Sequence, residues 1–198
     1  MSERSIEEGK RLLRAAAISR RKGLPVENSS AWSRCIQETV VRFPPFLRAL
    51  GVILYKPLQG EVDTGLIRDD ALKARKMVFY SNPDPSGSPE LIMPDLAAAG
   101  CQPMNDVEAL LSSGEPGAVL IIVPGLLFDC RGNRLGRGGG WYDRLLSRIG
   151  VNAATAALAY EFQIIDEVPA DDWDWPVDYI VTERRTIDCA RTRSSFAS

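Results

Sequence analysis

Residues 118–149, AVLIIVPGLLFDCRGNRLGRGGGWYDRLLSRI, contain the pattern that decides the fold. The run at 119–123 is continuously apolar and ends at a proline and a glycine, which is typical of a strand covered on both faces. A glycine-rich stretch follows, and residues 140–149 are predicted to form a helix. A buried strand, a loop and a helix in this order indicate an α/β fold.

The rest of the chain repeats this alternation of short apolar runs and helical segments. Further strands are predicted at residues 52–55, 77–80, 156–160 and 179–181. Helices are predicted at residues 6–21, 31–42, 63–73 and 107–112, the second of them ended by Pro44 and Pro45. We therefore expect a three-layer α/β/α sandwich with a mostly parallel central sheet, which binds its ligands at the carboxyl ends of the strands.

The length of 198 residues suits one domain, and we expect the sandwich to take up the whole chain, residues 1–198. Residues 83–90 (PDPSGSPE) are predicted to form a turn-rich surface loop. Residues 184–198, which end in RTRSSFAS, are predicted to form a flexible tail.

Composition excludes several classes of protein. The 24 Lys and Arg residues against 26 Asp and Glu residues leave a net charge of −2, so no overall charge attracts the chain to nucleic acid or to a membrane surface. No apolar run approaches the roughly 18 residues of a membrane span. The four cysteines form no C-x-x-C pair, which predicts reduced thiols rather than a zinc site or disulfides. We expect a cytoplasmic monomer without nucleic-acid or membrane partners.

The sequence contains no histidine. This absence removes Ser-His and Cys-His nucleophilic catalysis, the common zinc hydrolase sites and imidazole acid–base chemistry. Catalysis would therefore have to use carboxylates, lysine, arginine, tyrosine or a bound metal ion.

Residues 134–144 (RLGRGGGWYDR) lie between the strongest predicted strand and a helix N-terminus, where free N–H groups favour an anion such as phosphate. The Walker loop is excluded, because no Gly-Lys-Ser/Thr follows. The dinucleotide loop is excluded too, because Trp141 occupies the third glycine position after Gly136 and Gly138.

The charge around this loop is locally positive. Five arginines against two aspartates lie between Asp129 and Arg148, and clustered arginines bind phosphate oxygens in forked contacts. A flexible turn with solvated arginines explains the composition equally well, whereas a single unit is a poor RNA-binding RGG segment. Asp143 has two interpretations, as a ligand of phosphate-bound Mg²⁺ or as a favourable acidic residue in the first helical turn.

The predicted helix at 6–21 carries Lys10, Arg14 and Arg21 on one face. By itself such a basic stripe is typical of a solvated face.

Two segments carry a family resemblance. Residues 123–129 (VPGLLFD) and 132–144 (GNRLGRGGGWYDR) closely resemble the signature of the 5-formyltetrahydrofolate cyclo-ligases, also called methenyltetrahydrofolate synthetases. The resemblance continues in order along the chain, at residues 10–14 (KRLLR), 55–64 (YKPLQGEVDT), 161–163 (EFQ) and 177–183 (VDYIVTE).

The resemblance implies an ATP-driven, Mg²⁺-dependent cyclisation of 5-formyltetrahydrofolate to 5,10-methenyltetrahydrofolate, with release of ADP and phosphate. It implies the following contacts to ATP: Lys10, Arg14, Arg134, Leu135, Gly136, Arg137, Gly138, Gly139, Gly140 and Tyr142. It implies Tyr55, Glu61, Trp141 and Tyr142 as contacts to the folate, and Asp143 and Asp178 as Mg²⁺ ligands. The residues expected to take part in the chemistry are Arg134, Arg137 and Tyr142.

The chain also departs from the family pattern. Trp141 stands where the signature has the first of two tyrosines. The His-Asp pair usual before the last strand is replaced by a segment, 172–175 (DWDW), in an acidic stretch that is typical of a solvated loop. These departures keep two alternatives open: a non-catalytic relative that binds nucleotide or folate, and a phosphotransferase or ligase for another heterocyclic amide.

Overall fold

The computed structural model describes residues 3–83, 89–93, 103–113, 115, 117–149, 152–171 and 173–196. Its centre is a seven-stranded sheet in the order β3-β2-β1-β4-β7-β8-β9. The strands are β1 (Gly51–Leu54), β2 (Met77–Pro83), β3 (Pro89–Ile92), β4 (Val119–Val123), β7 (Ala154–Leu158), β8 (Tyr179–Val181) and β9 (Thr186–Asp188). The five inner strands run parallel, and the edge strands β3 and β9 pair antiparallel.

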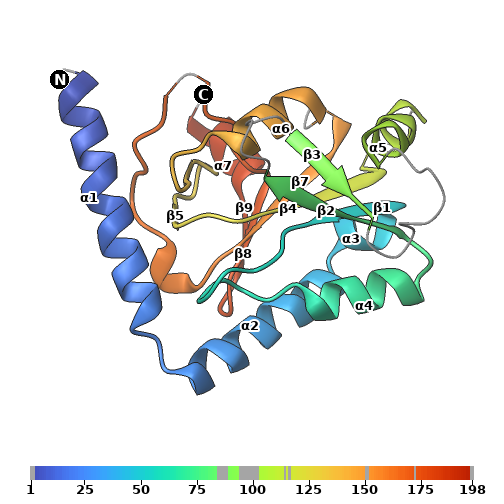
Figure 1. Cartoon of the computed structure of the whole chain (residues 1–198), viewed down its shortest axis with the longest axis horizontal. Coiled ribbons are helices and arrows are strands. Elements are labelled where there is room, and N and C mark those ends of the chain that lie inside the picture. The colour runs from blue at the N-terminus through green and yellow to red at the C-terminus, as the bar shows by residue number, and fades with distance from the viewer. Residues whose placement is uncertain are drawn as a thin grey trace.

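Helices cover both faces of the sheet, as Figure 1 shows. One face carries α2 (Val26–Val41), α3 (Pro44–Arg48) and α4 (Gly65–Lys73), and the other carries α5 (Pro103–Ser112), α6 (Trp141–Ile149) and α7 (Cys189–Phe196). Alternate residues of β1 explain the layers, because Val52 and Leu54 pack against the first set of helices and Ile53 against the second. The predicted three-layer α/β/α sandwich is therefore confirmed.

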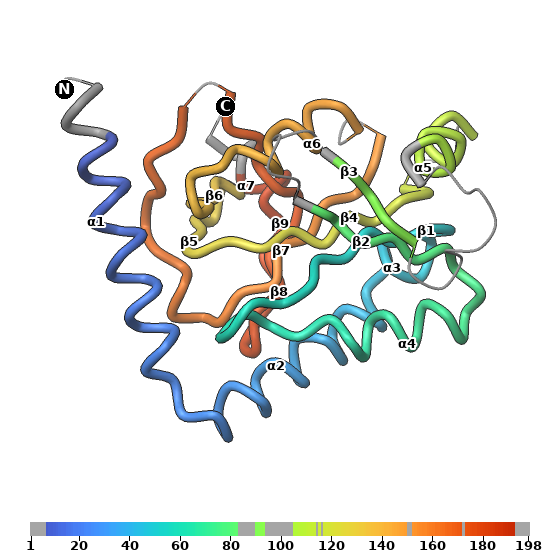
Figure 2. Tube along the Cα trace, in the orientation of Figure 1, coloured from blue at the N-terminus to red at the C-terminus, as the bar shows by residue number. Residues whose placement is uncertain are grey.

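The N-terminal helix α1 (Glu3–Lys22) lies outside these layers. Its Ala17 packs against a small two-stranded hairpin, β5 (Leu127–Phe128) and β6 (Arg134–Leu135), through Leu126 and Leu135. Figure 2 shows α1 alongside the segment that leads from the short 3₁₀ helix η3 (Glu161–Gln163) to β8. Helix α1 thus reaches the carboxyl ends of the strands from the side.

Several predicted boundaries are wrong. The helix predicted at 31–42 ends before Pro44 and Pro45 as expected, but it begins earlier, at Val26, and the two prolines begin α3, since proline suits the first helical turn. The predicted surface loop at 83–90 contributes its first residue to β2 and its last two to β3, and its centre, 84–88, lies outside the described residues. Strand β7 begins two residues earlier than predicted.

The predicted flexible tail at 184–198 is also wrong over most of its length. Ile187 pairs with Ile180 of β8 and is buried, and Cys189 is buried beneath the same layer. One apolar residue in a three-residue strand is too short a signal to be read from the sequence. Helix α7 follows directly and closes the described chain.

No helix among the described residues is long and apolar enough to cross a membrane. The described cysteines, Cys35, Cys130 and Cys189, form no disulfide with one another, and Cys101 lies outside the described residues.

Candidate functional site

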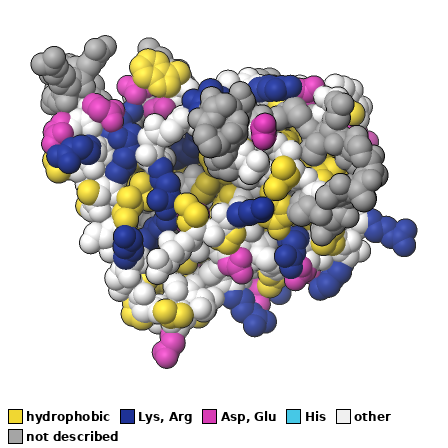
Figure 3. All heavy atoms as spheres, viewed as in Figure 1, with side chains coloured by type: hydrophobic (Ala, Val, Ile, Leu, Met, Phe, Trp, Pro, Cys, Tyr) yellow, Lys and Arg dark blue, Asp and Glu magenta, His cyan; other side chains and the backbone are white. Residues whose placement is uncertain are grey.

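A cavity of about 690 Å³ lies where β4 ends, between α1, the loop 134–140 and the acidic segment that contains Asp171, Trp173 and Asp174. Its volume is in the usual range for small-molecule sites, and its place is the one expected of an α/β sheet. The lining residues are Glu7, Lys10, Arg14, Glu61, 124–126, 134–144, Ser147, Asp171, Trp173 and Asp174. Figure 3 shows Lys and Arg side chains gathered beside α1, next to exposed hydrophobic side chains.

The structure brings together every predicted site residue except two. The whole loop 134–140, Lys10, Arg14, Glu61 and residues 141–143 line this one cavity. Tyr55 and Asp178 do not line this cavity.

The glycine-rich loop depends on glycine at two positions. Gly138 has φ +99° and Gly140 has φ +60°, backbone angles that residues with a side chain rarely adopt. At Gly136 and Gly139 an added Cβ would meet open space, so the loop leaves room above its backbone. The loop ends where α6 begins, and a helix N-terminus of this kind presents free N–H groups to anions.

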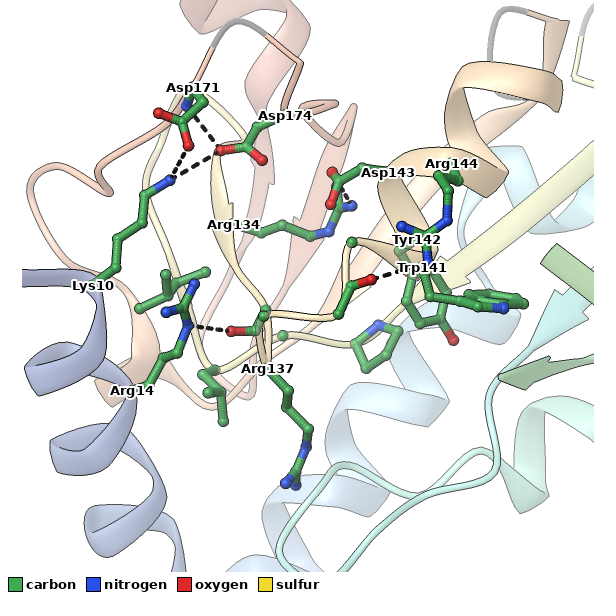
Figure 4. A pocket seen from close by; sticks show the side chains of 18 of the residues that line it. Lys10, Arg14, Arg134, Arg137, Trp141, Tyr142, Asp143, Arg144, Asp171 and Asp174 are labelled. Carbon is green, nitrogen blue, oxygen red and sulfur yellow. Dashed lines mark hydrogen bonds and ion pairs between the residues drawn. The ribbon is translucent and has the colours of Figure 1, made fainter. Parts of the chain in front are cut away.

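Two cations of α1 reach the cavity, as Figure 4 shows. The Lys10 ammonium lies 2.6 Å from an Asp171 oxygen and 3.5 Å from an Asp174 oxygen. Burial opposes the charge of Lys10, but the hydrogen bond with Asp171 and the charges of both aspartates outweigh burial, so its pKa lies above the usual value. Arg14 donates from Nε to the Gly136 carbonyl oxygen at 3.2 Å, which ties α1 to the loop.

Arg134 is nearly buried at the base of the cavity. Its Nη2 donates to Asp143 Oδ1 at 2.6 Å, and its Nη1 donates to the carbonyl oxygen of Trp175. Burial lowers the pKa of Arg134, against the opposing charges of Asp143 and Asp174. The two aspartates therefore face the same guanidinium from α6 and from the acidic segment.

Glu61 lines the cavity next to the C-terminal turn of α1, and its side chain is only 9% exposed. Its Oε1 lies 3.2 Å from Arg21 Nη2 and 3.6 Å from Arg137 Nη2. Its Oε2 accepts from the Leu58 N–H at 3.0 Å. A carboxylate of the predicted folate site thus contacts an arginine of the predicted phosphate loop.

Two aromatic residues complete the wall. Trp141 is buried and makes an edge contact with Tyr142, with ring centroids 4.8 Å apart at 75°. The Tyr142 hydroxyl lies 2.7 Å from Ser81 Oγ, and burial raises the pKa of the phenol well above its usual value. Tyr142 is therefore a neutral hydrogen-bonding group.

Tyr55 and Asp178 have other surroundings. Tyr55 is buried behind Glu61, and its hydroxyl donates to the Val62 carbonyl oxygen at 2.7 Å. Asp178 accepts from the N–H and the hydroxyl of Thr155, at 3.0 and 2.8 Å, where β7 begins. The structure does not bring Asp178 to the cavity beside Asp143, because it lies before β8 rather than at the carboxyl end of the sheet.

The acidic segment was not predicted to belong to the site. Asp171, Trp173 and Asp174 line the cavity, although this stretch is typical of a solvated loop. Neither a motif nor helical spacing links these residues to Lys10, more than 160 positions earlier; only the fold does. Arg144, the last residue of the quoted motif, also lines the cavity.

Carboxylates that could contact a metal ion are present but few. Among the residues that the structure describes, no group of three or more acidic or cysteine side chains is placed to hold a metal ion. Asp143 and Asp174 both line the cavity. A site that shares its ion with a ligand's phosphates needs only one or two protein carboxylates.

The fold and the cavity define an α/β protein with a cavity at the carboxyl ends of its strands, lined by arginines, a lysine, carboxylates and aromatic residues. Residues 6–183 match the 5-formyltetrahydrofolate cyclo-ligase family. The chain is 32% identical to the 5-formyltetrahydrofolate cyclo-ligase of Mus musculus, over 92% of this chain and 98% of that protein. It is 27% identical to the enzyme of the same name from Escherichia coli (strain K12), over 82% of this chain and 94% of the other.

A solved structure agrees. The NMR structure of Aquifex aeolicus 5,10-methenyltetrahydrofolate synthetase superimposes with a TM-score of 0.71 at 31% identity, over 91% of this chain and 92% of that chain. The chain therefore belongs to the 5-formyltetrahydrofolate cyclo-ligase family, and it is an enzyme of the cyclo-ligase class.

Proposed function

We propose that this enzyme uses ATP and Mg²⁺ to cyclise 5-formyltetrahydrofolate to 5,10-methenyltetrahydrofolate, releasing ADP and phosphate. The observation that carries the proposal is the single cavity that joins two sets of residues. Lys10, Arg14 and the loop 134–140 suit phosphates, whereas Glu61 and the aromatic pair 141–142 suit a flat ring with N–H groups.

The chemistry needs an activated formyl group. A formamide oxygen is a poor leaving group, so its phosphorylation by ATP turns the formyl carbon into an electrophile that N10 of the folate attacks. This attack closes the ring, and departure of phosphate from the same carbon then leaves the methenyl bridge between N5 and N10. The enzyme has to align two substrates and to neutralise the charge of phosphoryl transfer, and the cavity offers arginines, a lysine and a helix N-terminus for this work.

Mg²⁺ would be held by Asp143, with Asp174 on the same cavity wall, and by phosphate oxygens of the nucleotide. Bound there, the ion would offset phosphate charge. The negative charges of Asp143 and Asp174 both favour the cationic form of Arg134, so this guanidinium interacts with both carboxylates. Arg134 and Lys10 hold the carboxylates in place, while Arg137, whose side chain is 50% exposed, is free to turn toward a phosphate.

On the folate side, Glu61 would accept hydrogen bonds from pterin N–H groups. Trp141 and Tyr142 supply the apolar wall next to it. Because burial keeps the Tyr142 phenol protonated, this residue would act as a hydrogen-bonding group rather than as a base.

The test mixes the protein with MgATP and 5-formyltetrahydrofolate and follows the absorbance of the methenyl product. We expect product that requires all three components, and phosphate released in equal amount. Absence of product, with nucleotide binding intact by calorimetry, would contradict the proposal and favour a non-catalytic binding relative.

A further inference from the structure

Arg21 belongs to the basic face of α1, but it does not line the cavity with Lys10 and Arg14. Its side chain is only 3% exposed and lies behind Glu61. Nη1 donates to the Gly125 carbonyl oxygen at 3.3 Å, and Nη2 donates to Glu61 Oε1 at 3.2 Å. A buried arginine of the outermost helix thus contacts the wall of the site from its far side.

The chain turn that carries Glu61 fits closely against this arginine. Gly60 has φ +79°, and a Cβ at Gly60 would lie 3.6 Å from the Arg21 Cβ. The Leu58 N–H fixes the second carboxylate oxygen at 3.0 Å. Both oxygens of Glu61 are therefore held by groups on the protein side, and their remaining lone pairs are available to a ligand.

Glu61 has two arginine partners that differ in burial. Arg137 is 50% exposed and lies in the glycine-rich loop, 3.6 Å from the same oxygen that Arg21 contacts. An almost buried carboxylate is costly unless it stays paired. If Arg137 turns to a phosphate of ATP, Arg21 is the partner that remains.

We propose that Arg21 is a positioning residue for the folate substrate: it keeps the Glu61 carboxylate oriented while Arg137 exchanges between Glu61 and the nucleotide. This inference rests on the proposed function. Arg21 itself touches neither substrate. Its effect reaches the folate only through Glu61.

The experiment measures binding of 5-formyltetrahydrofolate and, separately, of MgATP by calorimetry. We expect Arg21→Met to weaken folate binding about 10- to 100-fold, because a charged hydrogen bond to Glu61 is lost. We expect ATP binding to stay within about twofold. Arg21→Lys, which keeps the charge, should restore part of the folate affinity.

A double variant separates positioning from general support of the fold. In a Glu61→Gln background, Arg21→Met should weaken folate binding no further, because no carboxylate is left to position. Equal losses in both backgrounds would overturn the inference, and so would unchanged folate affinity in Arg21→Met. If Arg21→Met fails to fold, Arg21→Lys takes its place in the same comparison. The inference would be overturned as well if Arg21→Lys bound folate like the wild type and Glu61→Gln did not weaken that binding.

Arg20→Met is the matched control. Arg20 is the neighbouring residue of α1, and its guanidinium lies on the Phe162 ring, 4.8 Å from the centroid, away from Glu61. This variant should bind folate like the wild type.

The failure of the proposed function and the failure of this inference are distinguishable. A wild-type protein that binds MgATP but no folate would overturn both. A wild-type protein whose folate affinity does not change on substitution of Arg21 would overturn the inference alone.

Discussion

Arg134 and Asp143 are paired with each other inside the cavity, with Nη2 and Oδ1 2.6 Å apart. The arginine side chain is 4% exposed and the aspartate side chain 24%. Asp143 Oδ1 also accepts the Trp175 N–H at 3.2 Å, and Arg134 donates to the carbonyl oxygen of the same residue. The glycine-rich loop, the first turn of α6 and the end of the acidic segment are therefore joined at one point.

The first prediction concerns Asp143 and Mg²⁺. Asp143→Asn keeps the shape of the side chain but removes the anionic oxygen that Mg²⁺ prefers. We expect at least about a 10-fold higher Mg²⁺ concentration for half-maximal cyclisation. Asp70→Asn is the control, because Asp70 pairs with Lys73 on the exposed side of α4. An unchanged Mg²⁺ dependence in a folded Asp143→Asn protein would remove this residue from the metal site.

The second prediction compares two ion pairs of equal length. Arg134–Asp143 and Arg148–Glu108 both measure 2.6 Å, but the second pair is about half exposed. Arg134→Met leaves a largely buried carboxylate unpaired and should lower the free energy of unfolding by about 3 kcal/mol. Arg148→Met should change it by less than about 1 kcal/mol. Urea unfolding measures both, and similar losses would show that burial is not what makes the first pair important.

The third prediction concerns ATP. Lys10 and Arg11 are adjacent on α1, but Lys10 reaches the cavity, whereas Arg11 is 67% exposed and pairs with Glu8. Lys10→Met should weaken MgATP binding about 10-fold or more, because a charged donor to phosphate is lost. Arg11→Met should bind MgATP like the wild type. If the two variants lost ATP affinity equally, the effect would come from net charge rather than from a specific contact.

The fourth prediction is a pH dependence. The folded-state pKa of Lys10 lies above its unfolded value, so the folded protein holds this proton more tightly. The stabilisation is complete below the unfolded pKa, about 10.4, and is lost as the pH rises through the folded value. The difference in unfolding free energy between wild type and Lys10→Met should therefore be constant from about pH 8 to 10 and shrink above that. A difference that grew with pH would contradict the ion pair with Asp171.

The central layers of the fold could be predicted because their signals are local. Val119–Val123 is apolar without interruption, and such a run specifies a strand buried on both faces. The edge strands β3 and β9 have weaker signals, because a short strand that pairs on one side needs little more than one buried residue. Their places depend on the neighbouring strand, which the sequence does not name.

The candidate site also has a part that could be predicted from the sequence and a part that could not. Residues 134–143 form a continuous motif, so the loop, its arginines and Asp143 could be assigned together. Asp171, Asp174 and Arg21 were not assigned, because each acts through a partner far away in the chain: Lys10 for the aspartates and Glu61 for the arginine. A charged residue in isolation looks the same whether it is solvated or buried against a distant partner.

The last prediction concerns Trp141, where the family signature has tyrosine. The indole is buried, packs in the same core cluster as Leu145 and makes an edge contact with Tyr142, so it supports the fold as well as the cavity wall. Trp141→Ala should lower the free energy of unfolding by about 3 to 5 kcal/mol, whereas Trp141→Tyr should cost less than about 2 kcal/mol, because most of the ring volume is kept. If Trp141 contacts the folate, as the family resemblance implies, the Trp141→Tyr protein should also bind 5-formyltetrahydrofolate within a few-fold of the wild-type affinity in calorimetry, with MgATP binding unchanged. A folded Trp141→Tyr protein that no longer binds this folate would instead show that the tryptophan has reshaped the pocket for a different ring.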